Sequence, residues 1–287
     1  MKISELLKKK MTFSFEVFPP KEDKPMEPLA ETLNELARFK PDYISCTYGA
    51  GGTNVGRSKE TCKAIMDAGR NVMTHFTCIG SSREEATKKI GEYREMGVDN
   101  IMALRGDLPE GWKDTQGYFL HADRLIAHIK DNFPDICIGA ACYPEKHISA
   151  VSKEADIAHL RSKQDNGAGF FLTQLCYDTQ EYERFREKLR KAGVTVPVIV
   201  GIMPVLFKDG LIRMTLSNGC SIPSDLADVI GKYGEDPDDF KKAGKEYTIK
   251  LMYKYMNMGI DGMHIYSLNK YKDLAEIIND SGIRGIF

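Results

Sequence analysis

The feature that most constrains the fold of this chain is a repeated alternation of short β-branched or aromatic runs with longer amphipathic segments. The ends of the early runs recur roughly every 30 residues, which is the length of one strand–helix unit. Strands that alternate with helices in this order form a parallel sheet with helical crossovers. The expected strands lie at 12–18, 42–48, 72–78, 100–106, 137–143, 169–177, 196–204 and 262–268.

The segments between these strands carry apolar residues at helical spacing and are expected to be helices. Gly69, Gly97, Gly167 and Gly193 each follow directly after such a segment, where a left-handed C-cap favours glycine. The stretch 206–259 is too long for a single crossover and is expected to hold two or three helices. The other expected helices lie at 28–39, 57–68, 83–96, 123–132, 152–164, 179–192 and 271–280.

Eight strand–helix units predict an α/β fold, a closed (β/α)₈ TIM barrel with extra helices between strands seven and eight. We expect one domain over residues 1–287, because such barrels hold this many residues and no Ser/Gly-rich linker is present. An open doubly wound sheet is the alternative. It is disfavoured because the first strand runs into Pro19 and Pro20, where a dinucleotide-binding sheet would carry Gly-x-Gly-x-x-Gly.

Composition excludes several classes of function. Lys and Arg number 40 and Asp and Glu 41, so the net charge of −1 gives no basic surface for nucleic acid. The longest mostly apolar run, 196–207, is too short to cross a membrane, and the start has no secretory signal, so we expect a cytoplasmic protein. Seven cysteines without a Cys-x-x-Cys pair fit a reducing compartment, and the six histidines lack metal-ligand spacing.

The site is expected at the carboxyl ends of the strands, where TIM barrels carry their chemistry. Strand alternation turns Thr12, Ser14 and Glu16 inward, and the apolar residues between them toward the helices. Glu16 lies among phenylalanines and prolines, so desolvation should raise its pKa and suit it to be a general acid. A solvated carboxylate, or an ion pair with Arg105, is the alternative. Other polar residues expected to face the same opening are Ser45, Thr47, His75, Thr77, Arg105, Asp107 and Gln174.

A glycine-rich segment at 51–58 resembles a phosphate-binding loop between a strand and a helix. It departs from that motif at one residue, Arg57, which stands where the motif has lysine. A nucleotide-binding module is therefore a minor alternative. A milder possibility is that the backbone of this loop borders a phosphate or carbonyl group of a ligand.

Several separated motifs together resemble one family. They are Phe-Glu-Val-Phe-Pro-Pro at 15–20, Thr-Tyr-Gly-Ala at 47–50, His-Phe-Thr-Cys at 75–78, Leu-Arg-Gly-Asp-Leu-Pro at 104–109, Tyr-Pro-Glu-Lys-His at 143–147 and Thr-Gln at 173–174. In collinear order from about residue 11 to 269, the chain resembles the 5,10-methylenetetrahydrofolate reductases of the bacterial, single-barrel type. The resemblance implies a flavin, normally FAD. The unusual loop at 109–121 leaves FMN open.

The resemblance also implies a ping-pong reaction. NAD(P)H would reduce the flavin, and methylenetetrahydrofolate would then take the hydride to become 5-methyltetrahydrofolate. Glu16 would protonate the folate, and Asp107 would act with it as a catalytic residue that contacts both flavin and pterin. Gln174 and Lys270 would complete the substrate site. The cofactor-binding positions that the resemblance implies are Thr47, Tyr48, His75, Arg105, Gly106, Asp107, His121, Tyr143, His147, Asp156, His159 and Lys163.

One departure from the family lies after strand seven. Gly210 and Met214 stand where the family commonly has glutamine and phenylalanine for a stacked substrate. Two alternatives therefore stay open: a pterin-binding methyltransferase without redox chemistry, and a reductase subunit that an iron–sulfur partner protein supplies with electrons. The family resemblance also suggests a homo-oligomer.

Overall fold

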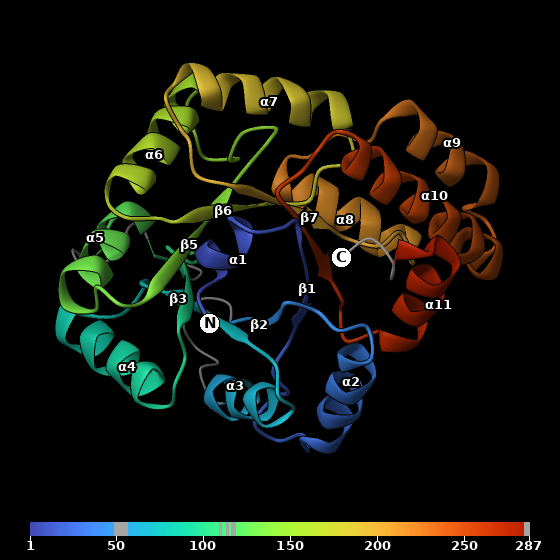
Figure 1. Cartoon of the computed structure of the whole chain (residues 1–287). Helices are drawn as coiled ribbons and strands as arrows, with labels where there is room; N and C mark the ends of the chain where they lie inside the picture. The colour runs from blue at the N-terminus through green and yellow to red at the C-terminus, as the bar shows by residue number, and fades with distance from the viewer. Residues whose placement is uncertain (49–56, 109–110, 113–114, 116–118, 284–287) are drawn as a thin grey trace.

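The computed structural model describes residues 1–48, 57–108, 111–112, 115 and 119–283 (Figure 1). Eight parallel strands pair in chain order and close into a barrel, because β8 pairs with β1. The predicted (β/α)₈ barrel is therefore confirmed. The strands are β1 (Thr12–Val17), β2 (Tyr43–Cys46), β3 (Val72–Thr77), β4 (Asn100–Leu104), β5 (Cys137–Cys142), β6 (Phe170–Thr173), β7 (Val198–Ile202) and β8 (Gly262–Tyr266).

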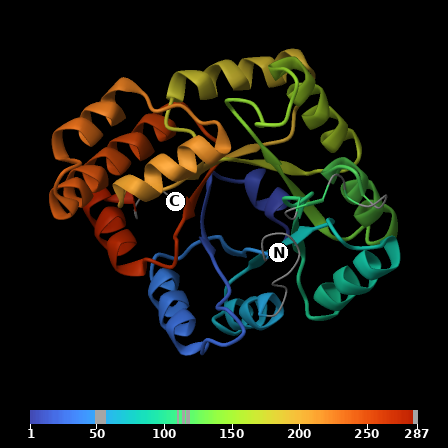
Figure 2. The same ribbon diagram turned by 180° about the vertical axis from the view of Figure 1, so that it is seen from behind.

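Helices surround the barrel on its outside, as the views from the two ends show (Figures 1 and 2). The glycines expected to end helices do so with positive φ, such as +71° at Gly69 and +93° at Gly97. The helices are α1 (Ile3–Leu7), α2 (Glu27–Ala37), α3 (Ser58–Asp67), α4 (Arg83–Glu95), α5 (Ala122–Asn132), α6 (Lys153–Asp165), α7 (Thr179–Lys191), α8 (Lys208–Asn218), α9 (Ser224–Tyr233), α10 (Pro237–Asn257) and α11 (Tyr271–Ser281). In the described ranges, none of them has the length and apolar composition that crossing a bilayer requires.

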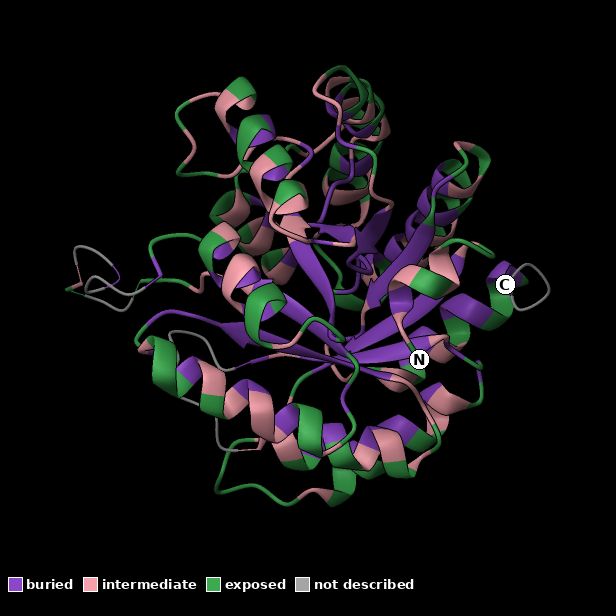
Figure 3. Ribbon diagram, turned by 60° about the vertical axis from the view of Figure 1, so that its left-hand side comes forward, coloured by how far each residue is buried: buried purple, intermediate pink, exposed green. Residues whose placement is uncertain are grey.

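Strand alternation builds two apolar layers. Phe13, Phe15 and Val17 of β1 belong to the large cluster between the barrel and its helices. A smaller cluster fills the inside of the barrel, with Tyr43 and Met102 among its members. Figure 3 shows the strands as the most thoroughly buried part of the molecule. The polar residues Thr12, Ser14 and Glu16 face this interior, as the alternation predicts.

The short helix α1 is absent from the sequence-based expectations. Five residues are too few to show helical periodicity, and α1 has no side-chain N-cap. Ile3 nevertheless belongs to the inner cluster, and its backbone N–H donates to Oδ1 of Asn100 over 2.8 Å. Helix α1 therefore closes the amino-terminal end of the barrel, opposite the end expected to carry the chemistry.

The predicted strands extend too far at their carboxyl ends. β2 ends at Cys46, β4 at Leu104 and β6 at Thr173, so Thr47, the segment 105–107 and Gln174 lie in loops and not in strands. Gly106 has a φ of +88°, which no extended strand adopts. The long segment after β7 holds α8, α9 and α10, which confirms the expected two or three helices.

Candidate active site

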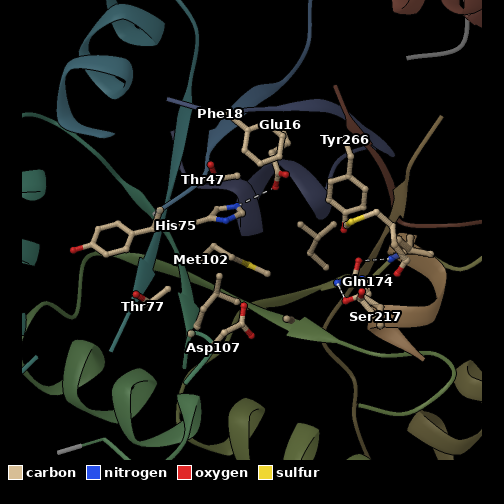
Figure 4. A pocket seen from close by; sticks show the side chains of 18 of the residues that line it. Glu16, Phe18, Thr47, His75, Thr77, Met102, Asp107, Gln174, Ser217 and Tyr266 are labelled. Atoms are coloured by element: carbon tan, nitrogen blue, oxygen red, sulfur yellow. Dashed lines mark hydrogen bonds and ion pairs between the residues drawn. The ribbon is translucent and has the colours of Figure 1, made fainter. Parts of the chain in front are cut away.

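A cavity of about 700 Å³ opens at the carboxyl ends of the strands. That volume lies within the range typical of sites for large organic ligands. Its wall includes most of the residues expected to form a site. These are Glu16, Thr47, Tyr48, His75, Thr77, Arg105, Gly106, Asp107, Tyr143, His147 and Gln174. Figure 4 shows Glu16 and His75 at one side of the cavity and Gln174 and Tyr266 at the other.

Glu16 is the buried acid of this cavity. It ends the inward row of β1, and only 7% of its surface is exposed. Its Oε2 atom lies 3.5 Å from Nε2 of His75 and 4.0 Å from Nε2 of His264. Burial raises the pKa of Glu16 to about 8, because a carboxylate loses its hydration there. At neutral pH the group is therefore a carboxylic acid that can donate a proton.

The two histidines beside Glu16 are neutral at the same pH. Burial lowers the pKa of His75 to about 4, and burial together with the nearby His75 lowers that of His264 to about 3. The alternative of an ion pair between Glu16 and Arg105 does not hold, since His75 and His264 are the basic groups within 4.0 Å of the Glu16 carboxyl group among the described residues. Neutral imidazoles leave the proton on the carboxyl group.

Three buried polar atoms in the cavity wall have no hydrogen-bond partner within the described residues. They are Nε2 of His75, Oγ1 of Thr77 and the hydroxyl of Tyr48. Each unsatisfied group costs about 1–3 kcal/mol. They come from two neighbouring segments of one wall, β3 and the residues after β2, and suit a ligand with several polar atoms along its edge. The isoalloxazine ring of a flavin, with its nitrogens and carbonyl oxygens, has that chemistry.

Gly106 and Asp107 form the loop after β4. A Cβ at Gly106 would lie 2.7 Å from Cγ2 of Ile79 and 3.0 Å from Cβ of Thr77, so only glycine fits this turn. The turn places Asp107, which is exposed, at the cavity wall (Figure 4). Glu16 and Asp107 therefore differ in hydration, since one carboxyl group is shielded and the other is open to solvent.

Gln174 is held by helix α8. Its Nε2 donates to Oδ1 of Asn218 over 2.9 Å, and its Oε1 accepts from the N–H of Leu175. Asn218 was not foreseen from the sequence, because it lies in the helical segment after β7 with no motif around it. Met214 also lines the cavity, whereas Gly210 is not among its lining residues.

Two further residues were missed, both on β8. The hydroxyl of Tyr266 donates to the carbonyl of Thr173 over 2.6 Å, and a Cβ at Gly201 would collide with that hydroxyl. His264 is fully buried below Glu16. The sequence pattern that could have predicted them is the alternation along β8, which turns His264 and Tyr266 inward together with Gly262.

Some predicted cofactor-binding residues lie outside the cavity wall. Asp156 accepts from the N–H of His147 over 2.9 Å, and Nζ of Lys163 donates to the carbonyl of Ala141 over 2.8 Å. Asp156 thus supports a cavity residue from behind. Lys163 is half-buried, and desolvation lowers its pKa.

Three more predicted residues are exposed and also lie outside the wall. His121 and His159 lie together at α5 and α6, with ring centroids 5.9 Å apart. Lys270 lies over the ring of Phe207 at 5.8 Å. Residues 49–56, which make up most of the glycine-rich loop, fall outside the described residues. Arg57, at the start of α3, lines the cavity.

The fold and the cavity define a class: an α/β barrel with a shielded acid in a ligand-sized cavity at the carboxyl ends of its strands. The model of the family "Methylenetetrahydrofolate reductase" matches residues 2–282. The chain belongs to this family, which confirms the resemblance seen in the motifs.

Two relatives and one solved structure illustrate the relationship. The chain is 31% identical to "5,10-methylenetetrahydrofolate reductase" of Pectobacterium carotovorum subsp. carotovorum, over 97% of this chain and 92% of that protein. It is also 31% identical to "Methylenetetrahydrofolate reductase 1" of Schizosaccharomyces pombe, over 99% of this chain but only 49% of that protein, so it spans about half of that relative. A Clostridium thermocellum protein described as binding two copies of 5-methyl-5,6,7,8-tetrahydrofolic acid shares the fold, with a TM-score of 0.69, 14% identity and 98% coverage of both chains.

Proposed function

We propose that this chain reduces 5,10-methylenetetrahydrofolate to 5-methyltetrahydrofolate with electrons from NAD(P)H, through a bound FAD. Family membership supports the reaction, and the described tetrahydrofolate ligands of the Clostridium thermocellum protein support the substrate class. The observation that carries the proposal is the shielded acid Glu16 in the wall of a cavity large enough for an organic ligand.

The cofactor would lie along the wall that holds the unsatisfied polar atoms. Thr47, Tyr48, His75, Arg105 and Gly106 would contact its ring and ribityl chain. Its phosphates and adenosine would be bound by Tyr143, His147, Asp156, Lys163, His121 and His159. FMN has no adenosine, so with FMN the residues of this set that would bind the adenosine would have no ligand. When bound, the flavin would accept hydride from the nicotinamide and pass it to the folate.

Glu16 would act on the folate as a general acid. Transfer of its proton to nitrogen 10 breaks the bond between that nitrogen and the methylene carbon, and the bonding electron pair stays on nitrogen 10. The lone pair of nitrogen 5 then forms a double bond to the methylene carbon, which gives an iminium cation that accepts hydride. Glu16 is left as a carboxylate and regains a proton from solvent. Its raised pKa supports this role, since an acid with a pKa of about 8 still holds its proton at neutral pH.

The other substrate residues would orient the pterin and stabilise its charge. Asp107 would stabilise the iminium cation electrostatically. The amide of Gln174, which Asn218 orients, would hydrogen-bond the polar edge of the pterin. Lys270 would meet a phosphate of the nicotinamide cofactor or a carboxylate of the folate.

A second candidate keeps the same folate chemistry but takes electrons from an iron–sulfur partner protein. Met214 in the cavity wall favours it, because a thioether replaces the aromatic ring expected to stack on nicotinamide. The two candidates differ only in the electron donor.

The test is an anaerobic study of both half-reactions with the purified protein. We expect bound flavin, its bleaching by NADH or NADPH, and its reoxidation by methylenetetrahydrofolate. Glu16→Gln should keep the first half-reaction and lose the second by a factor of about 10²–10⁴. The matched control is Glu22→Gln, which changes an exposed carboxylate of the same cavity and should alter neither.

Three results would contradict parts of this proposal. Equal loss of both half-reactions in Glu16→Gln would refute the acid role. A flavoprotein that dithionite reduces but neither nicotinamide cofactor reduces would favour the partner protein. A colourless protein that binds folate would favour the methyltransferase.

A further inference from the structure

His264 lies below Glu16 in the barrel interior and has no part in the reaction as proposed so far. It is fully buried, and both of its ring nitrogens have hydroxyl partners. Nδ1 lies 2.7 Å from Oγ of Ser14 on β1, and Nε2 lies 3.2 Å from Oγ of Ser45 on β2. A neutral imidazole has one N–H and one lone pair, so the two serines must play opposite parts.

The hydrogen bonds of the serines decide which nitrogen carries the proton. The hydroxyl of Ser14 donates to the carbonyl of Met263 over 3.3 Å, so its oxygen is free to accept from Nδ1–H of His264. The hydroxyl of Ser45 then donates to Nε2. The opposite tautomer would take the hydrogen of Ser14 for Nδ1 and leave the hydroxyl of Ser45 without an acceptor among the described residues. Only the Nδ1–H tautomer satisfies the donors of Ser14, Ser45 and His264 together.

In this tautomer Nε2 carries no hydrogen, and its partial negative charge lies near the acid. Nε2 of His264 lies 4.0 Å from Oε2 of Glu16, and Ser45 is the register partner of Glu16 across β1 and β2. An unprotonated nitrogen at that distance opposes a negative charge on the carboxyl group, whereas an N–H in its place would stabilise the carboxylate. The choice of tautomer therefore bears on whether Glu16 holds its proton.

We propose that His264 is a positioning residue, fixed as the Nδ1–H tautomer by Ser14 and Ser45, whose unprotonated Nε2 keeps Glu16 in its protonated form. The inference rests on the proposed acid role of Glu16 and adds to it the groups that maintain the acid. It does not require His264 to touch the substrate or to accept a proton.

The other titratable groups around Glu16 do not change their charge near pH 8. Tyr43 of β2 and Tyr266 of β8 have pKa values raised far above their usual range by burial. His75 of β3 stays neutral above a pKa of about 4. Cys46 of β2 faces α3 on the outer side of the barrel, where its thiol donates to the carbonyl of Ser58. Glu16 is therefore the member of this set expected to titrate near pH 8.

The test compares two matched variants that each remove one hydroxyl from His264. Ser14→Ala deletes the acceptor of Nδ1–H, so the histidine shifts its proton to Nε2 and presents an N–H toward Glu16. Ser45→Ala deletes only the donor to Nε2 and leaves the lone pair in place. In single-turnover folate reduction, the fall in rate at high pH should move down by about one pH unit or more in Ser14→Ala. In Ser45→Ala it should stay or move up.

A readout without turnover accompanies the rates. Two-bond ¹H–¹⁵N correlation spectra of the ¹⁵N-histidine-labelled protein distinguish the two tautomers. His264 should be Nδ1–H in the unaltered protein and in Ser45→Ala, and Nε2–H in Ser14→Ala. A purely structural role would lower rates in both variants without moving the pH dependence.

Two outcomes separate this inference from the proposed function. If Glu16→Gln loses folate reduction but Ser14→Ala leaves the pH dependence unchanged, the role of His264 is wrong and the acid role stands. If Glu16→Gln retains folate reduction, the acid role is wrong and this inference falls with it. An Nε2–H tautomer in the unaltered protein would also overturn the inference.

Discussion

The carboxyl group of Glu16 and the imidazole of His75 face each other across 3.5 Å at the cavity wall, and burial keeps both neutral. A carboxylic acid beside a neutral imidazole carries the same number of protons as an ion pair, so desolvation decides between the two. The neutral pair keeps the proton on Glu16, where the proposed reaction needs it.

The first prediction concerns stability against pH. The folded-state pKa of Glu16 is raised from 4.5 to about 8, so the folded chain holds an extra proton and stability falls as pH rises through that window. The pKa values of His75 and His264 are lowered from 6.5 to about 4 and about 3, so stability also falls as pH drops below 6.5. From these three groups we expect the free energy of unfolding to be largest near pH 6.5.

Urea denaturation across this pH range measures the effect. Glu16→Gln should remove most of the decline between pH 6.5 and 8, since the glutamine does not titrate. An unchanged decline in that variant would mean that another group causes it.

The second prediction concerns the turn after β4. Gly106→Ala should cost at least about 2 kcal/mol of stability, because the new Cβ meets Ile79 and Thr77 at a positive φ. It should also reduce flavin retention. Gly69→Ala is the control: its φ of +71° is similar, but no atom lies within 4 Å, so about 1 kcal/mol is expected. Equal thermal shifts in the two variants would rule out the steric contribution.

The third prediction concerns Gly201, which leaves space for the hydroxyl of Tyr266. Gly201→Ala should push that ring away from the carbonyl of Thr173 and into the cavity, with a stability loss of about 1–3 kcal/mol. Near-ultraviolet circular dichroism and folate affinity should both change. Gly231→Ala, on α9 with open space around it, should be neutral or stabilising.

The fourth prediction concerns the amide pair between Gln174, in the loop after β6, and Asn218 of α8. Asn218→Ala leaves Nε2 of Gln174 without its acceptor, so the amide loses its fixed orientation. We expect the KM for the folate to rise about 10-fold with a smaller change in kcat, since a lost hydrogen bond costs about 1 kcal/mol or slightly more. Ser217→Ala removes a neighbouring cavity hydroxyl and should have little effect. A larger fall in kcat than rise in KM would contradict a role in binding.

The sequence predicts the barrel well, because the alternation of strand and helix patterns is regular and glycines mark the helix ends. The strand ends are less predictable. Thr47, Arg105 and Gln174 have residue types that an extended strand accepts, and only the barrel geometry shows that pairing stops before them. The short helix α1 depends on its tertiary contact at Ile3, which no local pattern reveals.

The residues of the candidate site also fall into those that the sequence indicates and those that only the structure reveals. Glu16 and Asp107 lie in motifs with residue types suited to acid and electrostatic chemistry, so the sequence indicates them directly. His264 and Asn218 act through partners distant in sequence, at separations of 250 and 44 residues. Such pairings need the closed barrel before they can be recognised.

The central claim is that Glu16 is a shielded acid that holds its proton at neutral pH. Infrared difference spectroscopy tests it directly, through the carboxylic C=O band that is present in the unaltered protein and absent in Glu16→Gln. We expect this band to disappear with a midpoint near pH 8. A midpoint near the ordinary value of 4.5 would show that the carboxyl group is ionised at neutral pH, and that Glu16 is not the proton donor.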